Sequence, residues 1–337
     1  MKKLILHIGL HKTGSTAVQE TLHKNRGIGL KHGLHYPAFT ANFSRALCGI
    51  FGPDQHKLLV NQLSGHDTPE KFARARKATS KRLLNDLSTI AEPTTLISGE
   101  DATALPLLDV GALSRFFHSM FDEVKILAYV RPPRAHINSI IQQKIRKGER
   151  LGKLLKDPPA PLYRARLEPY YNVFGAENIT VKAFAPKTLH RQCIVADVLN
   201  QMGFDDELYD KLTVDRKNDT LSWPATFYLN AINKDLPIYV DGKPNRKRER
   251  HLISNARKIT GEKFALPYSY LNQGCSEYTD DIAWVEEKLG VKLSPLDIQP
   301  GEADDRPLAH FIAEKREEAF ISLSRYLHDL NLQPATK

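Results

Sequence analysis

The stretch LILHIGLHKTGSTAV, residues 4–18, determines what the first part of this chain is expected to form. Residues 4–10 are an apolar run with the length and composition of a buried β-strand, and residues 16–24 follow with a helical pattern. Gly14 between them allows a tight turn, and the N–H groups that open a helix point at whatever lies in front of its first turn. The pattern predicts a strand, an anion-binding turn and a helix N-terminus, for which a phosphate or a sulfate ester is the natural ligand.

The side chains of this turn suit the same kind of ligand. Lys12 adds a positive charge, and Ser15 and Thr16 add hydroxyl donors. Gly9 and Gly14 are spaced as in the Gly-x4-Gly frame of an ATPase loop, but that loop requires a lysine directly after the second glycine. Here the lysine precedes Gly14 by two positions and a serine follows it. The segment therefore fits an anion-binding loop and departs from a Walker A loop.

A second strand-to-helix junction carries an arginine. Residues 124–130 are an apolar β-type run that ends at the tetrapeptide RPPR (131–134), and residues 135–147 have a helical pattern. Because proline is favoured at the first helical position, Arg131 is expected at the carboxyl end of the strand. Ser139 lies eight residues later, about two helical turns away. A guanidinium fork and a hydroxyl in this arrangement can hold one phosphate from two sides.

Together, the two junctions resemble the 5′-phosphosulfate loop and the 3′-phosphate motif of sulfotransferases that use 3′-phosphoadenosine 5′-phosphosulfate (PAPS). The resemblance implies PAPS as co-substrate, with 3′,5′-adenosine bisphosphate (PAP) as product. It also implies that Lys12 neutralises the departing phosphate, while Arg131 and Ser139 bind the 3′-phosphate. The implied co-substrate-binding residues are Lys12, Thr13, Gly14, Ser15, Thr16, Ala17, Arg131 and Ser139.

The resemblance favours the bacterial, carbohydrate-type branch of this superfamily. Ala17 stands where the phenol and steroid enzymes usually carry a tryptophan, and His11 stands where the family loop usually carries a proline. The likeness covers roughly the first 185 residues well and the remainder loosely. It implies a hydroxylated acceptor, for which a carbohydrate or glycoconjugate is expected, while a lipid-linked or small hydroxylated metabolite stays open.

A base for the acceptor hydroxyl is expected after a third strand. Residues 94–99 form that strand and end at Glu100 and Asp101. In a parallel sheet, ligands gather outside the carboxyl ends of the strands, so Glu100 is predicted to lie near the reacting group. The family commonly uses a glutamate or histidine from this region. Glu100 is the predicted base, while Asp101, which could instead cap a helix, and His11 stay open as alternatives.

The alternation of strands and helices predicts an α/β, P-loop-type fold with three layers. A fourth strand is expected at residues 178–184 and an edge strand at residues 34–36, which gives a central parallel sheet of about four or five strands with helices on both faces. The expected organisation is a single sulfotransferase domain over residues 1–337. Residues 1–185 would form its nucleotide-binding core, and residues 186–337 a mainly helical extension that shapes the acceptor cleft.

The composition narrows the class of protein. The chain has 337 residues and a formal net charge of +9, which suits a polyanionic co-substrate. The basic run 243–250 lacks the interleaved aromatic residues of a nucleic-acid module, and its role, like that of the basic cluster 144–150, stays open between a solvated face and an anion contact. For that reason we expect no nucleic-acid partner. We also expect no metal, because the thirteen histidines are scattered.

The apolar runs and the cysteines of the chain predict where in the cell the protein is located. The longest apolar run near the start is too short for a membrane span or a signal peptide, and it leads straight into the predicted loop. The three cysteines are unclustered, which fits a reducing compartment. The sequence therefore predicts a cytoplasmic protein without a membrane span.

The function predicted from these residues is in-line transfer of the sulfuryl group of PAPS to an acceptor hydroxyl. Two alternatives come from other classes. A P-loop kinase would use ATP and Mg²⁺, and Glu100 and Asp101 would have to hold the metal. A non-catalytic anion-binding or nucleic-acid-binding protein would rest on the positive charge alone.

Overall fold

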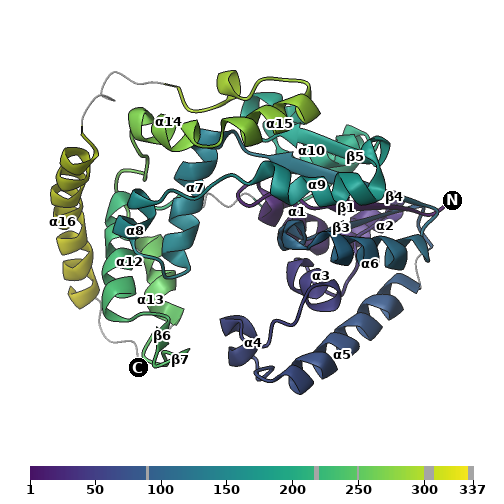
Figure 1. The fold of residues 1–337 in the computed structure, drawn as a ribbon, viewed down its shortest axis with the longest axis horizontal. Coiled ribbons are helices and arrows are strands. Elements are labelled where there is room, and N and C mark those ends of the chain that lie inside the picture. Colours follow the sequence, from purple (N-terminus) through teal and green to yellow (C-terminus); the bar gives the residue numbers. More distant parts are fainter. Residues whose placement is uncertain (89–90, 216–219, 249, 300–306, 333–337) are drawn as a thin grey trace. The chain divides into compact units, whose positions relative to one another are not determined.

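The computed structural model describes residues 1–88, 91–215, 220–248, 250–299 and 307–332, in two compact units. The first unit comprises Met1–Pro132, Leu162–Lys217 and Asp280–Leu296, and the second comprises Pro133–Pro161, Asn218–Thr279 and Asp297–Lys337. Figure 1 shows both units, coloured along the sequence. The expectation that residues 1–337 work as one sulfotransferase domain stays a prediction.

A five-stranded parallel sheet is the centre of the first unit, with strand order β2-β3-β1-β4-β5. The strands are β1 (Lys3–His7), β2 (Leu34–His35), β3 (Thr94–Ser98), β4 (Glu123–Val130) and β5 (Ile179–Ala183). Each one matches a predicted strand to within a few residues. The prediction of an α/β fold with a parallel sheet of four or five strands is confirmed.

The central strand β1 shows why the sheet is covered on both faces. Its consecutive residues Leu4, Ile5, Leu6 and His7 are all buried, although successive side chains of a strand point to opposite faces. Continuous apolar strands of this kind are typical of parallel sheets with helices on each side. The helices α6 (Leu107–His118) and α9 (Tyr163–Phe174) pack on β4 and against each other, while α1 (Ser15–Lys24) packs on β3 and against α10 (Ile194–Gln201).

The remaining elements of the first unit are mostly helical. They are α1 (Ser15–Lys24), α2 (Arg26–Lys31), α3 (Ser44–Phe51), α4 (Leu59–Leu63), α5 (Pro69–Ser88), α10 (Ile194–Gln201), α11 (Asp206–Asp210) and α15 (Thr279–Leu289), with the 3-10 helices η1 (Glu100–Ala104), η2 (Ala176–Asn178), η3 (Pro186–Thr188), η4 (His190–Gln192) and η6 (Ser294–Leu296). The predicted helix 16–24 is therefore α1, which begins directly after Gly14.

Among its described residues, the regular elements of the second unit are helices and one short hairpin. Its elements are α7 (Pro133–Arg146), α8 (Leu151–Lys156), α12 (Trp223–Asp235), β6 (Tyr239–Val240), β7 (Lys243–Pro244), α13 (Arg250–Asn255), η5 (Ala256–Lys258), α14 (Tyr268–Ser276) and α16 (Leu308–Leu332). The sequence predicts a helix start near Trp223, and Ser222 caps α12 there by accepting a hydrogen bond from the N–H of Ala225. The Trp223 indole is buried and its ring centroid lies 4.4 Å from that of Phe264, so it is a core residue.

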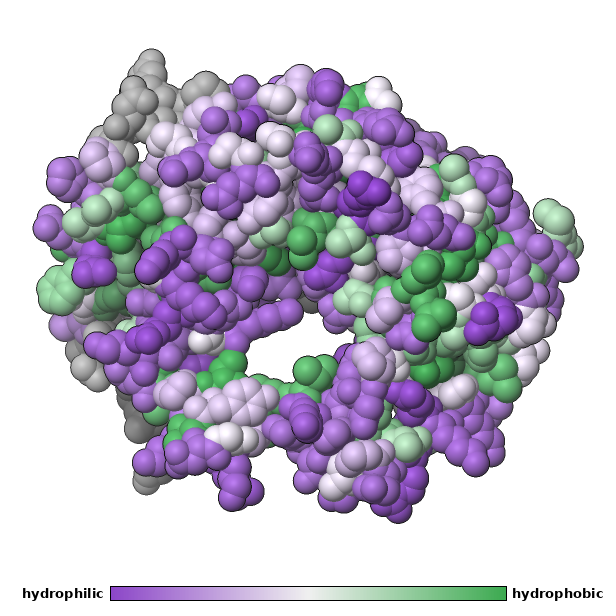
Figure 2. All heavy atoms as spheres, in the orientation of Figure 1, coloured by the Kyte–Doolittle hydropathy of each residue, from purple (hydrophilic) through white to green (hydrophobic). Residues whose placement is uncertain are grey.

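The face of the molecule drawn in Figure 2 is mainly polar. Hydrophilic side chains cover most of the face seen in Figure 2, while the large apolar residues of the sheet are buried. Within the described ranges, no helix is both long and apolar enough to cross a lipid bilayer.

Candidate anion-binding and active site

The carboxyl ends of the central strands bring the predicted site residues to one edge of the sheet. In the parallel pairing of β1 with β3, His7 lies beside Ser98, and β4 pairs with β1 on its other side. The segments that follow these three strands carry Lys12, Glu100 and Arg131 respectively. This edge is where ligands bind in open α/β sheets.

The loop after β1 has a constrained backbone. Gly14 has a φ of 80°, in the left-handed region that glycine favours, and it is the N-cap residue of α1. Lys12 also has a positive φ, of 70°, which is uncommon for a residue with a side chain and costs about 1–2 kcal/mol. The Thr13 hydroxyl donates to the Leu10 carbonyl at 2.6 Å and so closes the loop from inside. Because that proton is already used, any contact of Thr13 with an anion would come from its main chain.

The N-terminus of α1 is open. Ala17 and Val18 donate to the carbonyl of Gly14, and Gly14 has no side chain that could cap the helix. Within the described part of the chain, the main-chain N–H groups of Ser15 and Thr16 have no carbonyl acceptor. These groups carry the positive end of the helix dipole, so the start of α1 is suited to an anion.

Ser15 supplies a second, independent sign of a ligand at this loop. The residue is 6% exposed, and its hydroxyl oxygen has no hydrogen-bond partner among the described residues. A buried hydroxyl without a partner costs free energy, so such groups are normally satisfied by protein, water or ligand. Ser15 therefore fits the prediction that this loop holds a phosphate or sulfate ester.

Gly9 allows three polar side chains to approach the inside of the loop. A Cβ atom at Gly9 would lie 2.8 Å from Oγ1 of Thr13 and 2.9 Å from Nε2 of His7, and 3.1 Å from Oγ of Ser15. Each of these distances is shorter than van der Waals contact. The loop can close in this way only because position 9 has no side chain.

Glu100 is held by amide groups from two other elements. Oε2 of Glu100 accepts a hydrogen bond of 2.8 Å from the side chain of Gln19, which is on α1. The Asn42 amide lies 3.2 Å from Oε1 and 3.3 Å from Oε2. Both carboxylate oxygens thus accept hydrogen bonds, and Glu100 is connected to α1, the helix that follows the loop after β1.

The ionisation of Glu100 results from opposing effects. Burial would raise the pKa of Glu100, but hydrogen bonds from Gln19, from its own main chain and from Asn42, with the charge of His11, lower the pKa below its ordinary value. Glu100 is therefore ionised at neutral pH and is able to accept a proton. An ionised carboxylate is thus hydrogen-bonded to α1, the helix whose N-terminus is open.

The two alternative bases contact each other. Nε2 of His11 lies 3.3 Å from Oδ1 of Asp101, and the Asp101 side chain is about half exposed. Asp101 lies inside η1, whose N-cap is Gly99, so its carboxylate does not cap a helix as the sequence allowed. Which of Glu100, Asp101 and His11 acts as base stays a prediction.

Arg131 is attached to the loop that contains Lys12. It follows the last residue of β4, as predicted, and its Nη1 donates to the main-chain carbonyl of Lys12 at 2.8 Å. Its guanidinium lies over the ring of Phe184, 5.5 Å from the ring centroid. The Tyr163 hydroxyl donates to the Arg131 carbonyl. The Arg131 side chain thus links the end of β4 to the loop that contains Lys12.

Ser139 is buried on α7, in the second unit, so its predicted contact with the same phosphate as Arg131 stays a prediction. The start of α7 differs from that of α1. The N–H groups of Arg134 and Ala135 each donate to the Asp297 carboxylate at 2.8 Å. A protein carboxylate therefore already fills the N-terminus of α7, and side chains would have to supply any phosphate contact there.

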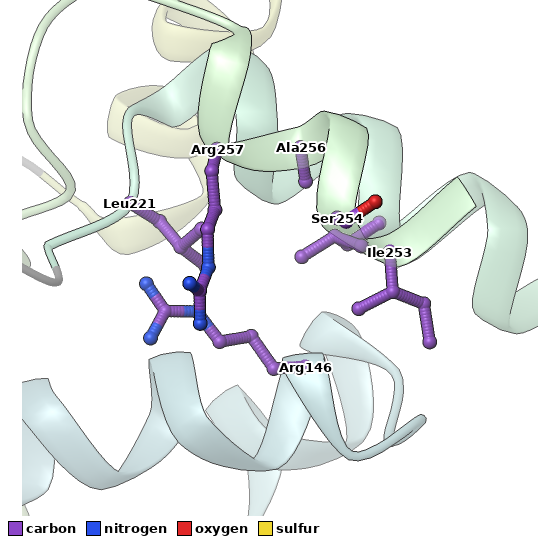
Figure 3. Close-up of a pocket in the computed structure, with 7 residues that line it drawn as sticks. Arg146, Leu221, Ile253, Ser254, Ala256 and Arg257 are labelled. Carbon is purple, nitrogen blue, oxygen red and sulfur yellow. The ribbon is translucent and has the colours of Figure 1, made fainter. Parts of the chain in front are cut away.

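The second unit contains a cavity that the sequence did not indicate. Its volume is about 430 Å³, and its walls are both apolar and basic (Figure 3). The lining residues are Arg146, Leu221, Leu229, Ile253, Ser254, Ala256 and Arg257. Arg146 belongs to the basic cluster 144–150 of the sequence, so at least one cation of that cluster faces a cavity.

The basic run 243–250 is only partly a solvated surface. Lys243 and Pro244 form β7, and Arg248 donates to the carbonyl of Leu236 and to Oδ1 of Asn233. Burial lowers the pKa of Arg248. Residue 249 and the side chain of residue 250 lie outside the described residues.

Three functional candidates were missed from the sequence: His7, Gln19 and Asn42. Gln19 had a detectable signal, because it lies four residues after Ser15 and so on the same face of α1, among buried positions. His7 follows three consecutive apolar residues at the end of β1, which marks a buried histidine. Asn42 gave no signal, because only the folding of the chain brings it to Glu100. Among the described residues, no group of three His, Cys, Asp or Glu side chains has the arrangement of a metal site.

Comparison with known proteins finds a distant likeness among solved structures. No protein-family model and no curated protein matches the chain. Among solved structures, the chain is similar to a sulfotransferase from Alicyclobacillus acidocaldarius, with a TM-score of 0.42 and 12% identity, over 88% of this chain and 99% of that chain. At this distance the likeness assigns neither an activity nor a site residue to the chain.

Proposed function

We propose that this protein is a PAPS-dependent sulfotransferase that acts on a hydroxylated acceptor, a carbohydrate or glycoconjugate. The observation that carries the proposal is the open N-terminus of α1, with the buried, unpartnered hydroxyl of Ser15, next to the ionised Glu100. A helix terminus binds the anionic group, and a carboxylate at the same sheet edge removes the acceptor proton.

The donor side of the reaction would be served by the loop after β1. PAPS would supply the sulfuryl group, which forms a bond to the acceptor oxygen while its bond to the phosphate oxygen breaks. The N–H groups of Ser15 and Thr16 and the Ser15 hydroxyl would bind the 5′-phosphosulfate. The Lys12 ammonium would neutralise the charge that develops on the departing phosphate, which is electrostatic stabilisation of the transition state.

The acceptor side would be served by Glu100. Its ionised carboxylate would take the proton of the attacking hydroxyl, a contribution of about 10²- to 10⁴-fold. Arg131 and Ser139 would bind the 3′-phosphate and so distinguish PAPS from ATP, since one hydrogen bond to a charged group contributes about 1.5–3 kcal/mol. The acceptor class follows the likeness of the loop to the carbohydrate-type enzymes, with Ala17 where phenol and steroid enzymes carry a tryptophan.

Calorimetric titration with PAP, beside ATP with Mg²⁺, tests the proposal without knowledge of the acceptor. We expect tight binding of PAP and weak binding of ATP. A preference for ATP and Mg²⁺ would instead identify a kinase-like P-loop protein. Glu100→Gln should bind PAP as the wild type does and transfer little sulfuryl group from PAPS, whereas a near-normal rate would move the base to His11 or Asp101.

A further inference from the structure

The side-chain amide of Gln19 makes two hydrogen bonds deep in the first unit. Gln19 is 1% exposed, and its Nε2 donates to Oε2 of Glu100 at 2.8 Å and to Oγ of Ser98 at 3.2 Å. An amide nitrogen has two protons, so both bonds form at once. Gln19 therefore connects Glu100, after β3, to the end of that strand and to α1.

The hydrogen bonds continue from Ser98 to His7, and the donor and acceptor in each can be assigned. Because Ser98 accepts a proton from Gln19, its own proton is available to Nδ1 of His7, which lies 2.8 Å away. Burial lowers the pKa of His7 to about 4, with the charge of Glu100 acting in the opposite direction, so the neutral ring can accept that proton. The proton of His7 then lies on Nε2, which faces the inside of the anion loop beside Gly9. The orientation of the Gln19 amide itself is set by Glu100, because an ionised carboxylate only accepts hydrogen bonds and so requires the amide nitrogen to face it.

Asn42 is oriented independently of Gln19. Its Oδ1 accepts a hydrogen bond of 2.7 Å from the main-chain N–H of Ser44, at the start of α3. The orientation of the amide is thereby set, and its nitrogen faces Glu100. The start of α3 can come this close because Gly99 has no side chain: a Cβ there would lie 2.8 Å from the nitrogen of Ser44.

We propose that Gln19 and Asn42 are positioning residues for Glu100, which fix the orientation of its carboxylate and hold it in the ionised form. This inference rests on the proposed function for its catalytic meaning. Neither residue needs to touch the donor or the acceptor. Their effect on the reaction passes through Glu100, which they hold from α1 on one side and from the segment before α3 on the other.

Other titratable groups also act on Glu100 or respond to it. They are His7 on β1, His11 in the loop after β1, Tyr36 after β2 and Cys48 on α3, and His11 in turn contacts Asp101 on η1. Of these, His11 is the one whose charge helps to lower the pKa of Glu100. The two amides differ from all of them because they donate hydrogen bonds directly to the carboxylate.

The test exchanges each amide for an acid of the same shape. Gln19→Glu and Asn42→Asp each replace a donor NH₂ by a negatively charged oxygen, and Asn42→Asp keeps the oxygen that accepts from Ser44. Since two adjacent carboxylates cannot both ionise freely, we expect the titration of Glu100 to move upward by about one pH unit or more in each variant. Asn85→Asp, an exposed position on α5, adds the same charge elsewhere and should leave that titration unchanged.

The measurement is carbon-13 NMR of the protein labelled at its glutamate carboxyl groups, with the Glu100 signal assigned from Glu100→Gln. Asn42 is exposed, so its variant tests the proposal even if the buried Gln19→Glu fails to fold. A Glu100 titration that is the same in the wild type and in Asn42→Asp and any folded Gln19→Glu overturns the positioning role. Calorimetry with PAP on the same samples separates the two questions: absence of PAP binding contradicts the proposed function, whereas the carboxyl titration judges the positioning.

Discussion

The guanidinium of Arg131 donates a hydrogen bond to the main-chain carbonyl of Lys12, with 2.8 Å between the two atoms. The two residues are separated by 119 positions in the sequence, and they follow neighbouring strands of the sheet. The bond helps to hold Lys12 in its left-handed conformation. A substitution at Arg131 is therefore expected to change the conformation of the loop after β1 as well as the binding of any 3′-phosphate.

Arg131→Ala should reduce the preference for a nucleotide that carries a 3′-phosphate. Loss of one charged hydrogen bond, about 1.5–3 kcal/mol, corresponds to about a tenfold to hundredfold change in relative affinity. Calorimetry with PAP and with adenosine 5′-monophosphate measures this ratio in the wild type and the variant. Equal losses for both nucleotides would assign the effect of Arg131 to the loop alone.

Lys12→Ala and Lys12→Gly should both abolish turnover, because neither variant has the ammonium group. They should differ in stability. Lys12 has a φ of 70°, which glycine adopts without the penalty of about 1–2 kcal/mol, although the unfolded glycine chain has more entropy. We expect Lys12→Gly to have a free energy of unfolding about 0.5–1 kcal/mol above that of Lys12→Ala, measured by urea denaturation. An alanine variant as stable as the glycine variant would show that the loop relaxes.

Gly9→Ala should destabilise the protein, because its Cβ would lie 2.8 Å from Thr13 Oγ1 and 2.9 Å from His7 Nε2. Overpacking of this kind costs about 1–3 kcal/mol. Gly49→Ala is the matched control: Gly49 lies inside α3 with no atom near the added carbon, so alanine should stabilise by about 0.5–1 kcal/mol. Chemical denaturation of the two variants measures the contrast, and a Gly9→Ala protein as stable as the wild type would contradict the close packing of the loop.

His7 should make the stability of the protein depend on pH in the weakly acidic range. Burial lowers the pKa of His7 in the folded state to about 4, from 6.5 in the unfolded chain. Between these values the unfolded state binds a proton that the folded state does not, so stability falls as the pH falls from 6.5 toward 4. We expect this residue to account for a loss of about 2–3 kcal/mol between pH 7 and pH 4.5.

His7→Asn isolates this contribution, because asparagine keeps an acceptor near the position of Nδ1 but does not titrate. The variant should be less stable at pH 7, since it leaves space in the core, yet it should lose less stability on acidification than the wild type. Urea denaturation at pH 7 and pH 4.5 gives the difference. Parallel losses in the two proteins would mean that His7 is not the residue responsible.

The fold was largely predictable because its signals are local. The apolar runs before Lys12, Glu100 and Arg131 are strands, and the glycine and proline residues mark where they end. The order of strands in a parallel sheet then places those three residues at one edge. The details of the site were not local. Gln19 and Glu100 are 81 positions apart, and nothing in either segment specifies the other.

At Asp101 a local sequence signal was present but suggested a contact that the structure does not contain. An acid after a strand and before a helix is the ordinary signature of an N-cap, so capping was a reasonable interpretation. In the structure the N-cap of η1 is Gly99, two residues before Asp101, and the Asp101 carboxylate lies against His11 instead. The residue at which η1 begins determines that Asp101 contacts His11. That residue depends on packing with distant parts of the chain, which cannot be inferred from the local sequence.

The strand order also constrains how the protein can be made. The central strand β1 pairs with β3 and with β4, and its residue Lys3 lies opposite Thr94, a separation of 94 − 3 = 91 positions. At a synthesis rate of about 5–20 residues per second, β1 would leave the ribosome about 5–20 s before its first partner strand. During that interval β1 is an apolar strand without hydrogen-bonded neighbours and is exposed to other chains. We therefore expect the nascent protein to bind a chaperone at this strand.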